Sequence, residues 1–259
     1  MDLRKNWGVK SNAINNSNNN ISFDWFFRWI YEWQFGIGGG SVRTPLVYIA
    51  GLPLLSAYGI NLLVIPFSSL VGALTHRKNI DWKLARYLVI GGTLGTTISA
   101  FLAGFIPTLV LAIIFVIISI ITVLGIYFER ISPKMAQKIN PTPKTAAGGA
   151  FFLNFLTGMR GGSGGSLFPP FLRMMKLNIR KAIATSLFTT IFTAAAGVTV
   201  FWSRGKIILL PGLVVILGSI SEARLGSLIS LKTKPKWLEI GLSILVIILA
   251  LSVVYKALQ

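Results

Sequence analysis

Long uncharged segments divide this chain. The stretches Leu52–Thr75, Tyr87–Phe128, Ala182–Ser203 and Ile240–Tyr255 contain no charged side chain. A membrane-spanning helix needs about 20 apolar residues, so the second stretch, at 42 residues, predicts two helices that turn at Gly104–Pro107. The full pattern predicts spans near Leu52–Thr75, Leu84–Phe105, Thr108–Phe128, Ile179–Trp202, Ile207–Leu231 and Trp237–Leu258.

Composition agrees with this interpretation. The 259 residues are 53% hydrophobic and 12% charged, and their mean hydropathy is +0.71, which is too apolar for an average water-soluble domain. A net charge of +18 could indicate nucleic-acid binding, but the basic residues flank the apolar runs instead of lining one face. We therefore expect an all-α polytopic protein of the cell membrane that contacts the lipid bilayer and does not bind nucleic acid.

A glycine-rich stretch occurs twice, 125 residues apart, as GIGGGSVRTPL at Gly36–Leu46 and GGSGGSLFPPF at Gly161–Phe171. At this offset, ten of 46 successive positions are identical. Duplicated glycine-broken segments in an apolar chain are typical of transporters built from two repeats. We predict one transmembrane domain at 23–259, with repeat one at 23–128, a linker at 129–144 and repeat two at 145–259. The asparagine-rich tail at 1–22 is expected to be disordered.

Loop charge predicts how the repeats lie in the membrane. The loops Arg77–Arg86, Arg130–Lys144, Arg173–Lys181 and Lys232–Lys236 are basic, whereas the turns Gly51–Pro53 and Gly104–Pro107 carry no base. Basic loops stay cytoplasmic, and all four fall on one side only if each glycine-broken element enters and leaves on the same side. Each repeat is therefore predicted to combine one re-entrant hairpin with three transmembrane helices. Three crossings invert the second repeat relative to the first and put Lys138 and Lys234 inside, with Phe105 and Lys206 outside.

The glycine tips predict a site for a small anion. Irregular backbone is tolerated in hydrocarbon only where protein or a water-lined cavity surrounds it. Glycine lets the backbone approach a ligand closely, and we assign this role to Gly38, Gly39, Gly40, Gly164 and Gly165. Helices that begin near Ser41 and Ser166 would direct backbone N–H groups at the ligand. Glycine also serves close helix packing, which is the interpretation we prefer for Gly91 and Gly95.

Polar side chains near the tips complete the candidate site. Arg43 and Arg160 flank the tips, where a guanidinium could bind sulfonate or carboxylate oxygens, or else snorkel to an interface or form a structural ion pair. Asn61 and Ser186 occupy matching repeat positions, as do Ser68 and Thr193, and Thr185 lies beside Ser186. These groups could equally cap kinks or bond neighbouring helices.

Glu222 lies inside an expected span and is a candidate for proton coupling. Arg224, two residues on, could instead neutralise it in a structural network. The chain has no cysteine and one histidine, which leaves no thiol nucleophile and little metal chemistry. We therefore expect neither an enzyme nor a cofactor or metal site.

Four motifs together resemble the TauE/SafE family of sulfite exporters: GIGGG-x4-P at Gly36–Pro45, YGINLL at Tyr58–Leu63, GG-x-GG-x4-P at Gly161–Pro170 and AIATSLF at Ala182–Phe188. The resemblance covers Phe35–Leu258. It implies transport of sulfite, organosulfonates, thiosulfate or related carboxylates across a prokaryotic cytoplasmic membrane.

Two features depart from the family pattern. Phe23–Phe35 is short, aromatic and carries Asp24, Arg28 and Glu32, where the family has a longer apolar helix. Glu222 stands where the family more often has glycine. The leading hypothesis is an exporter that works by alternating access around the two tips. A passive anion channel and a transport-inactive member with an altered first hairpin are the alternatives, and a homodimer is left open.

Overall fold

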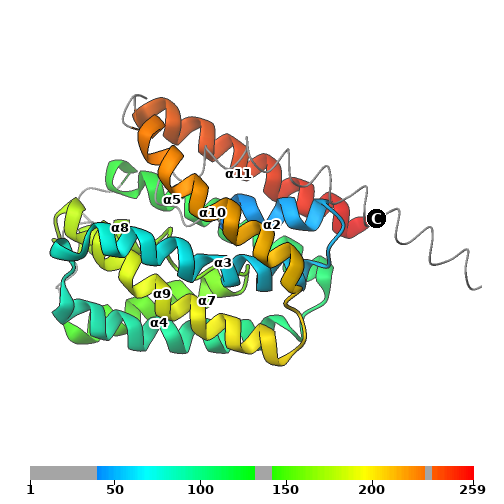
Figure 1. Ribbon diagram of the computed structural model, residues 1–259, viewed down its shortest axis with the longest axis horizontal. Helices are drawn as coiled ribbons and strands as arrows, with labels where there is room; N and C mark the ends of the chain where they lie inside the picture. Colours follow the sequence, from blue (N-terminus) through cyan, green and yellow to red (C-terminus); the bar gives the residue numbers. More distant parts are fainter. Residues whose placement is uncertain (1–39, 132–141, 231–234) are drawn as a thin grey trace, which may run out of the picture.

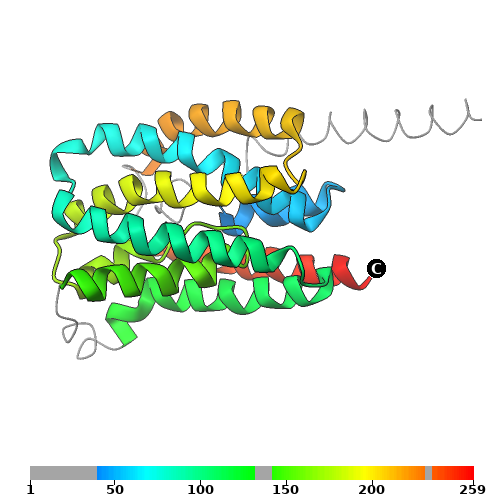
Figure 2. The same ribbon diagram turned by 90° about the horizontal axis from the view of Figure 1, so that it is seen from below.

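The computed structural model describes residues 40–131, 142–230 and 235–259. The predictions for the tail, for the aromatic segment Phe23–Phe35, for Gly38 and Gly39, and for Lys138 and Lys234 lie outside these residues. Within them the chain is helical and contains no strand. The long helices lie side by side along the long axis of the molecule in both views (Figures 1 and 2).

Six long helices of the described chain coincide with the six predicted spans to within three residues at each end. The helices are α2 (Gly40–Ile49), α3 (Leu54–Thr75), α4 (Trp82–Ala103), α5 (Thr108–Ile131), α7 (Pro143–Gly158), α8 (Phe168–Met174), α9 (Ile179–Ser203), α10 (Leu209–Ser230) and α11 (Pro235–Leu258), with a 3-10 turn η2 (Arg77–Asn79). Helices α5 and α7 extend into the stretch 129–144 that the sequence assigned to the linker.

Polar residues at the helix ends explain where three helices begin. The side chain of Asp81 accepts a hydrogen bond from the Leu84 amide at the start of α4, and Asn178 accepts one from the Lys181 amide at the start of α9. Thr142 and Thr145 form a capping box at the start of α7. Each cap satisfies a backbone N–H that the first helical turn leaves without a partner.

Helices at matching positions of the two repeats pack against each other in opposite directions. Gly59, near the start of α3, approaches Phe201 near the end of α9. Gly72, near the end of α3, approaches Leu187 near the start of α9. Helices α5 and α11 also pair, and the Tyr127 and Ser243 hydroxyls lie 3.2 Å apart where α5 ends and α11 begins. The colours of Figure 1 show the same opposed chain directions.

Three further pairs of helix contacts are reciprocal. Helix α4 packs on α9 as α10 packs on α3, α2 packs on α3 as α8 packs on α9, and α11 contacts α2 as α5 contacts α8. Each of these contacts has its counterpart when every helix is exchanged for its match in the other repeat. The duplication in the sequence is therefore also present in the packing.

Close packing of α4 against α7 fixes which loops share an end of the bundle. A side chain at Gly91 would meet the backbone of Ala147, and one at Gly95 would meet the backbone of Phe151. The packing interpretation of these two glycines is confirmed. Because the contacts advance together along both helices, α4 and α7 run in the same direction and begin at the same end.

Two loop contacts identify the ends. The Asp81 amide donates to Thr185 Oγ1 at 2.9 Å, which places the loop before α4 beside the start of α9. At the other end, the Arg204 guanidinium lies 4.7 Å from the ring centres of both Phe101 and Phe105. The described basic loops before α4, α7 and α9 therefore lie at one end, which we call the basic end. The predicted turn Gly104–Pro107 lies at the opposite end.

The surface of the bundle is strongly apolar. Leu74, Ile90, Leu124, Leu217 and Leu251, on five different helices, are each more than half exposed. Among the described helices, α3 and α9 are long and apolar enough to cross a membrane, and shorter apolar stretches occupy Thr108–Leu124, Leu209–Ser219 and Val246–Leu258. An apolar exterior of this extent is suited to lipid.

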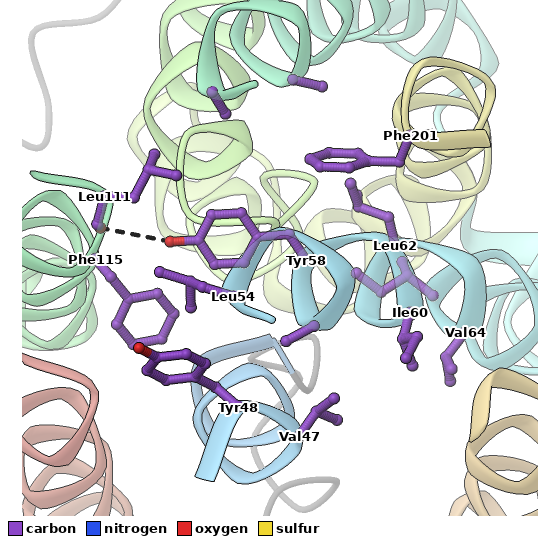
Figure 3. Close-up of a cluster of buried hydrophobic side chains, with 14 of the residues drawn as sticks. Val47, Tyr48, Leu54, Tyr58, Ile60, Leu62, Val64, Leu111, Phe115 and Phe201 are labelled. Carbon is purple, nitrogen blue, oxygen red and sulfur yellow. Dashed lines mark hydrogen bonds between the residues drawn. The ribbon is translucent and has the colours of Figure 1, made fainter. Parts of the chain in front are cut away.

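Inside the bundle, buried side chains of both repeats form the largest apolar cluster. Tyr58 stacks on Phe115 with ring centres 6.4 Å apart, and its hydroxyl donates to the Leu111 carbonyl at 3.4 Å (Figure 3). Phe201 and Leu62 join the same cluster from α9 and α3. This cluster supports the second glycine tip.

Candidate functional site

The second tip is the nonhelical turn between α7 and α8, residues 159–167. Gly161 and Gly164 have φ angles of +73° and +72°, in the left-handed region that favours glycine. A Cβ at Gly161 would lie 2.6 Å from the Cβ of Tyr58, and a Cβ at Gly164 would lie 2.7 Å from Nδ2 of Asn154. Turn geometry and close packing therefore both require glycine at these two positions.

Arg160 joins the second tip to the start of α2 in the first repeat. Its Nη1 donates to Ser41 Oγ of α2 at 2.7 Å, and its Nη2 donates to Ser166 Oγ of the second tip at 3.3 Å. Nη1 also reaches Ser119 Oγ of α5 at 3.5 Å. Ser41 and Ser166 occupy matching positions of the two repeats, so the duplicated serines converge on one guanidinium.

Arg43 forms a second connection between α2 and the second tip. Its Nη1 donates to Asn61 Oδ1 at 3.0 Å, and Asn61 Nδ2 donates to the Gly161 carbonyl at 2.6 Å. Arg43 is 2% exposed and Arg160 is 3% exposed. Neither side chain snorkels to an interface, which removes one of the alternatives for these residues.

Helices α7 and α9 hold the rest of the second tip. Thr193 donates to the Ser163 carbonyl at 3.1 Å, and Ser186 donates to the Gly165 carbonyl at 3.4 Å. Asn154, which packs on Gly164, accepts a hydrogen bond from Thr96 of α4 at 3.0 Å. Besides α2 and α5, which Arg160 contacts, the tip is therefore held by α3, α7 and α9.

The arrangement has the chemistry of an oxyanion site. A serine hydroxyl that accepts from Arg160 keeps its own hydrogen, which it can donate to another group. Ser163 Oγ is buried and makes no hydrogen bond within the described residues. A guanidinium and the hydroxyls around it can bind one sulfonate or carboxylate together, each donating a hydrogen bond to a different oxygen. The ring of Phe115, 6.0 Å from the guanidinium carbon of Arg160, closes one side of this group.

Most predicted site residues in the described chain lie at the second tip or at the start of α2 beside it: Gly40, Ser41, Arg43, Asn61, Arg160, Gly164, Gly165, Ser166 and Ser186. Thr185 is not among them, because its hydroxyl accepts from the Asp81 amide at the basic end. Ser68 bonds to the Ile65 carbonyl of its own helix. Glu222 belongs to α10, and its side chain lies outside the described part of the structure, as do Gly38 and Gly39.

The prediction that a helix begins near Ser166 and directs its amides at a ligand needs correction. Helix α8 begins at Phe168 and has seven residues. The amides of Leu167 and Phe168 both donate to the Gly164 carbonyl. These N–H groups at the start of α8 are therefore bonded within the turn and do not point at a ligand. Side chains, not helix amides, provide the donors described at this tip.

Sequence analysis missed Ser119, Asn154 and Ser163. Ser119 and Asn154 are isolated polar residues in the apolar runs VIISIIT and FFLNFLT. A buried polar group requires a partner, and this isolation was the signal that could have identified them. Ser163 lies between the paired glycines of the tip, where its position alone could have suggested a role.

Comparison with known proteins adds an independent finding. The family profile "Sulfite exporter TauE/SafE" matches residues 34–253. A probable membrane transporter protein of Methanocaldococcus jannaschii is 27% identical over 231 residues, which cover 81% of this chain and 85% of that protein. The probable membrane transporter protein YunE of Bacillus subtilis is 26% identical over 249 residues, covering 85% and 91%. No solved structure is a significant match.

Proposed function

The chain belongs to the sulfite exporter TauE/SafE family of membrane transporters, and from this premise we propose that it exports small sulfur-containing or organic anions such as sulfite or sulfonates. The anion binds between the two glycine tips, and transport proceeds by alternating access around them. The protein is a multi-pass protein of the cell membrane.

The convergence of Ser41 and Ser166 on Arg160 is the observation that carries this proposal. A buried cation surrounded by reorientable hydroxyls is a suitable partner for an oxyanion that has lost its water. The donors come from both repeats, so a bound anion would contact both halves of the protein at once. Such a site can respond to a movement of one half relative to the other.

We further propose that the repeats are inverted and that the second tip belongs to a re-entrant hairpin. Two observations support this topology. The matching pairs α3–α9 and α5–α11 are antiparallel, as an odd number of crossings per repeat requires. Helix α7 begins at the basic end, and the chain is back at that end when α9 begins beside Asp81.

Counterflow tests the transport function. Purified protein in vesicles loaded with unlabelled sulfite should accumulate labelled sulfite from outside, because a carrier exchanges one for the other. The double variant Ser41→Ala/Ser166→Ala should slow this exchange by about tenfold or more, since it removes two donors worth roughly 1 kcal/mol each. Ser68→Ala is the matched control, because Ser68 bonds only to its own helix in the described structure.

The outcomes separate the candidate functions. Anion flux without counterflow would identify a passive channel. No flux with sulfite, sulfonates, thiosulfate or carboxylates would identify a member that has lost transport. Exchange by the double serine variant at the rate of the Ser68→Ala control would remove the tips as the binding site.

A further inference from the structure

The basic end carries many exposed charges of one sign. Its exposed basic residues include Arg77, Lys78, Lys83, Arg86, Lys144, Lys176, Arg180 and Lys181. In the described stretches 76–90, 142–150 and 171–186, Asp81 is the one acidic residue, and its side chain caps α4. Within these stretches the exposed bases therefore have no acidic side chain beside them other than Asp81.

One part of this end combines charge with exposed aromatic rings. Trp82, at the start of α4, is 57% exposed and packs edge-on against Phe188 of α9, with ring centres 5.0 Å apart. Phe188 in turn packs against Phe192 at 5.1 Å, and Phe192 is also exposed. The three rings form a row that runs from the basic end along α9 toward the middle of the bundle.

Basic residues lie at the start of this aromatic row. Arg86 follows Trp82 by one turn of α4, and Lys181 precedes Thr185 by one turn of α9, so each pair shares a helix face. Thr185 is in direct contact with Asp81, beside Trp82. We call this group the Trp82 face: Trp82, Lys83, Arg86, Lys181, Phe188 and Phe192.

We propose that the Trp82 face binds a phospholipid with an anionic head group from the leaflet at the basic end. Arg86 and Lys181 hold the phosphate, Trp82 lies at the depth of the head groups, and an acyl chain follows Phe188 and Phe192. Basic clusters beside membrane helices attract anionic lipids, and tryptophan is enriched at the membrane interface. A soluble anion would use the charges but would leave the exposed rings of Trp82 and Phe192 without a role.

Lipid titration of the purified full-length protein tests this site. In detergent, phosphatidylglycerol should bind and raise the melting temperature, whereas phosphatidylcholine should do so much less. The variant Arg86→Gln/Lys181→Gln should bind phosphatidylglycerol roughly 30-fold more weakly, because each base near the membrane surface contributes about 1 kcal/mol of attraction to an anionic lipid and about 1.4 kcal/mol is a factor of ten. Lys144→Gln/Lys206→Gln removes the same charge from positions off the Trp82 face and should bind within about twofold of the unmodified protein.

Three results would overturn the proposal. The first is equal binding of phosphatidylglycerol and phosphatidylcholine by the unmodified protein. The second is an equal loss in the two double variants, which would mean that general surface charge attracts the lipid. The third is competition by soluble glycerol phosphate at the concentration at which phosphatidylglycerol acts, because a site that needs the aromatic row requires the acyl chain. Binding can be measured by native mass spectrometry even if a variant melts at a lower temperature.

Discussion

Replacing Arg160 with lysine separates the charge of this residue from its shape. The guanidinium uses Nη1 for Ser41 and Ser119 and Nη2 for Ser166. Lysine keeps the positive charge but has a single nitrogen at its tip. One nitrogen cannot occupy both Nη positions, so Arg160→Lys must lose the contact with the first tip or the contact within the second.

The expected effect follows from the number of hydrogen bonds lost. If the substrate anion is held by the planar fork, the lysine variant loses one charge-assisted hydrogen bond, which contributes about 1.5–3 kcal/mol. At about 1.4 kcal/mol for each factor of ten, anion binding should weaken by roughly 10- to 150-fold. A loss of this size is measurable even if the fold is fully retained.

Anion titration by thermal shift, followed by counterflow in vesicles, measures this loss. Arg204→Lys is the matched control, because Arg204 stacks on Phe101 and Phe105 at the far end of the bundle. It makes the same chemical change and should alter the melting temperature without altering anion affinity. The reasoning is refuted if Arg160→Lys binds sulfite and sulfonates within threefold of the unmodified protein, or if Arg204→Lys weakens binding equally.

Three further predictions concern the fold, the topology and the coupling. Gly161→Ala should lower the melting temperature, because its left-handed backbone leaves no room for a Cβ, whereas Gly148→Ala, where nothing lies within 4 Å, should not; equal melting of the two would contradict the packing argument. In this cysteine-free chain, single cysteines at Lys138 and Lys206 should label from opposite sides of the membrane, and labelling from one side would disprove the re-entrant second hairpin. Glu222→Gln should retain exchange at equal concentrations but lose acceleration by an imposed pH gradient; a variant still driven by pH would make Glu222 structural.

The helices could be predicted from the sequence because apolar length and loop residues define them locally. Helices α3 and α9 begin and end within two residues of the predicted spans, and the predicted turn Gly104–Pro107 joins α4 to α5. The proximity of α2 to the second tip could only be inferred from the duplicated glycines. The particular link from Arg160 to Ser41 joins residues 119 positions apart, and no local pattern specifies such a pair.

Helix phase was the main obstacle to predicting the site. Thr185 and Ser186 are adjacent, yet Ser186 reaches the Gly165 carbonyl while Thr185 reaches Asp81. Adjacent residues point about 100° apart around a helix. In a helix that is apolar on most sides, hydrophobic periodicity does not indicate which face is inside, so the sequence assigned both residues to one site.

The free energy of the contact between Arg160 and the first repeat can be compared with the free energy that a conformational change needs. Arg160 donates to Ser41 in the other repeat and to Ser166 within its own tip. Of these two contacts the one to Ser41 joins the repeats, and one charge-assisted hydrogen bond contributes about 1.5–3 kcal/mol. Moving a two-state equilibrium from 1:99 to 99:1 takes about 5.5 kcal/mol. An anion that accepts from Arg160 and from the hydroxyls of Ser41 and Ser166 would replace this direct contact by contacts of its own with both repeats. Under the proposed mechanism, the contact between Arg160 and Ser41 therefore accounts for part of the energy that such a shift needs, and the anion must supply the rest through contacts that it makes in one state and not in the other.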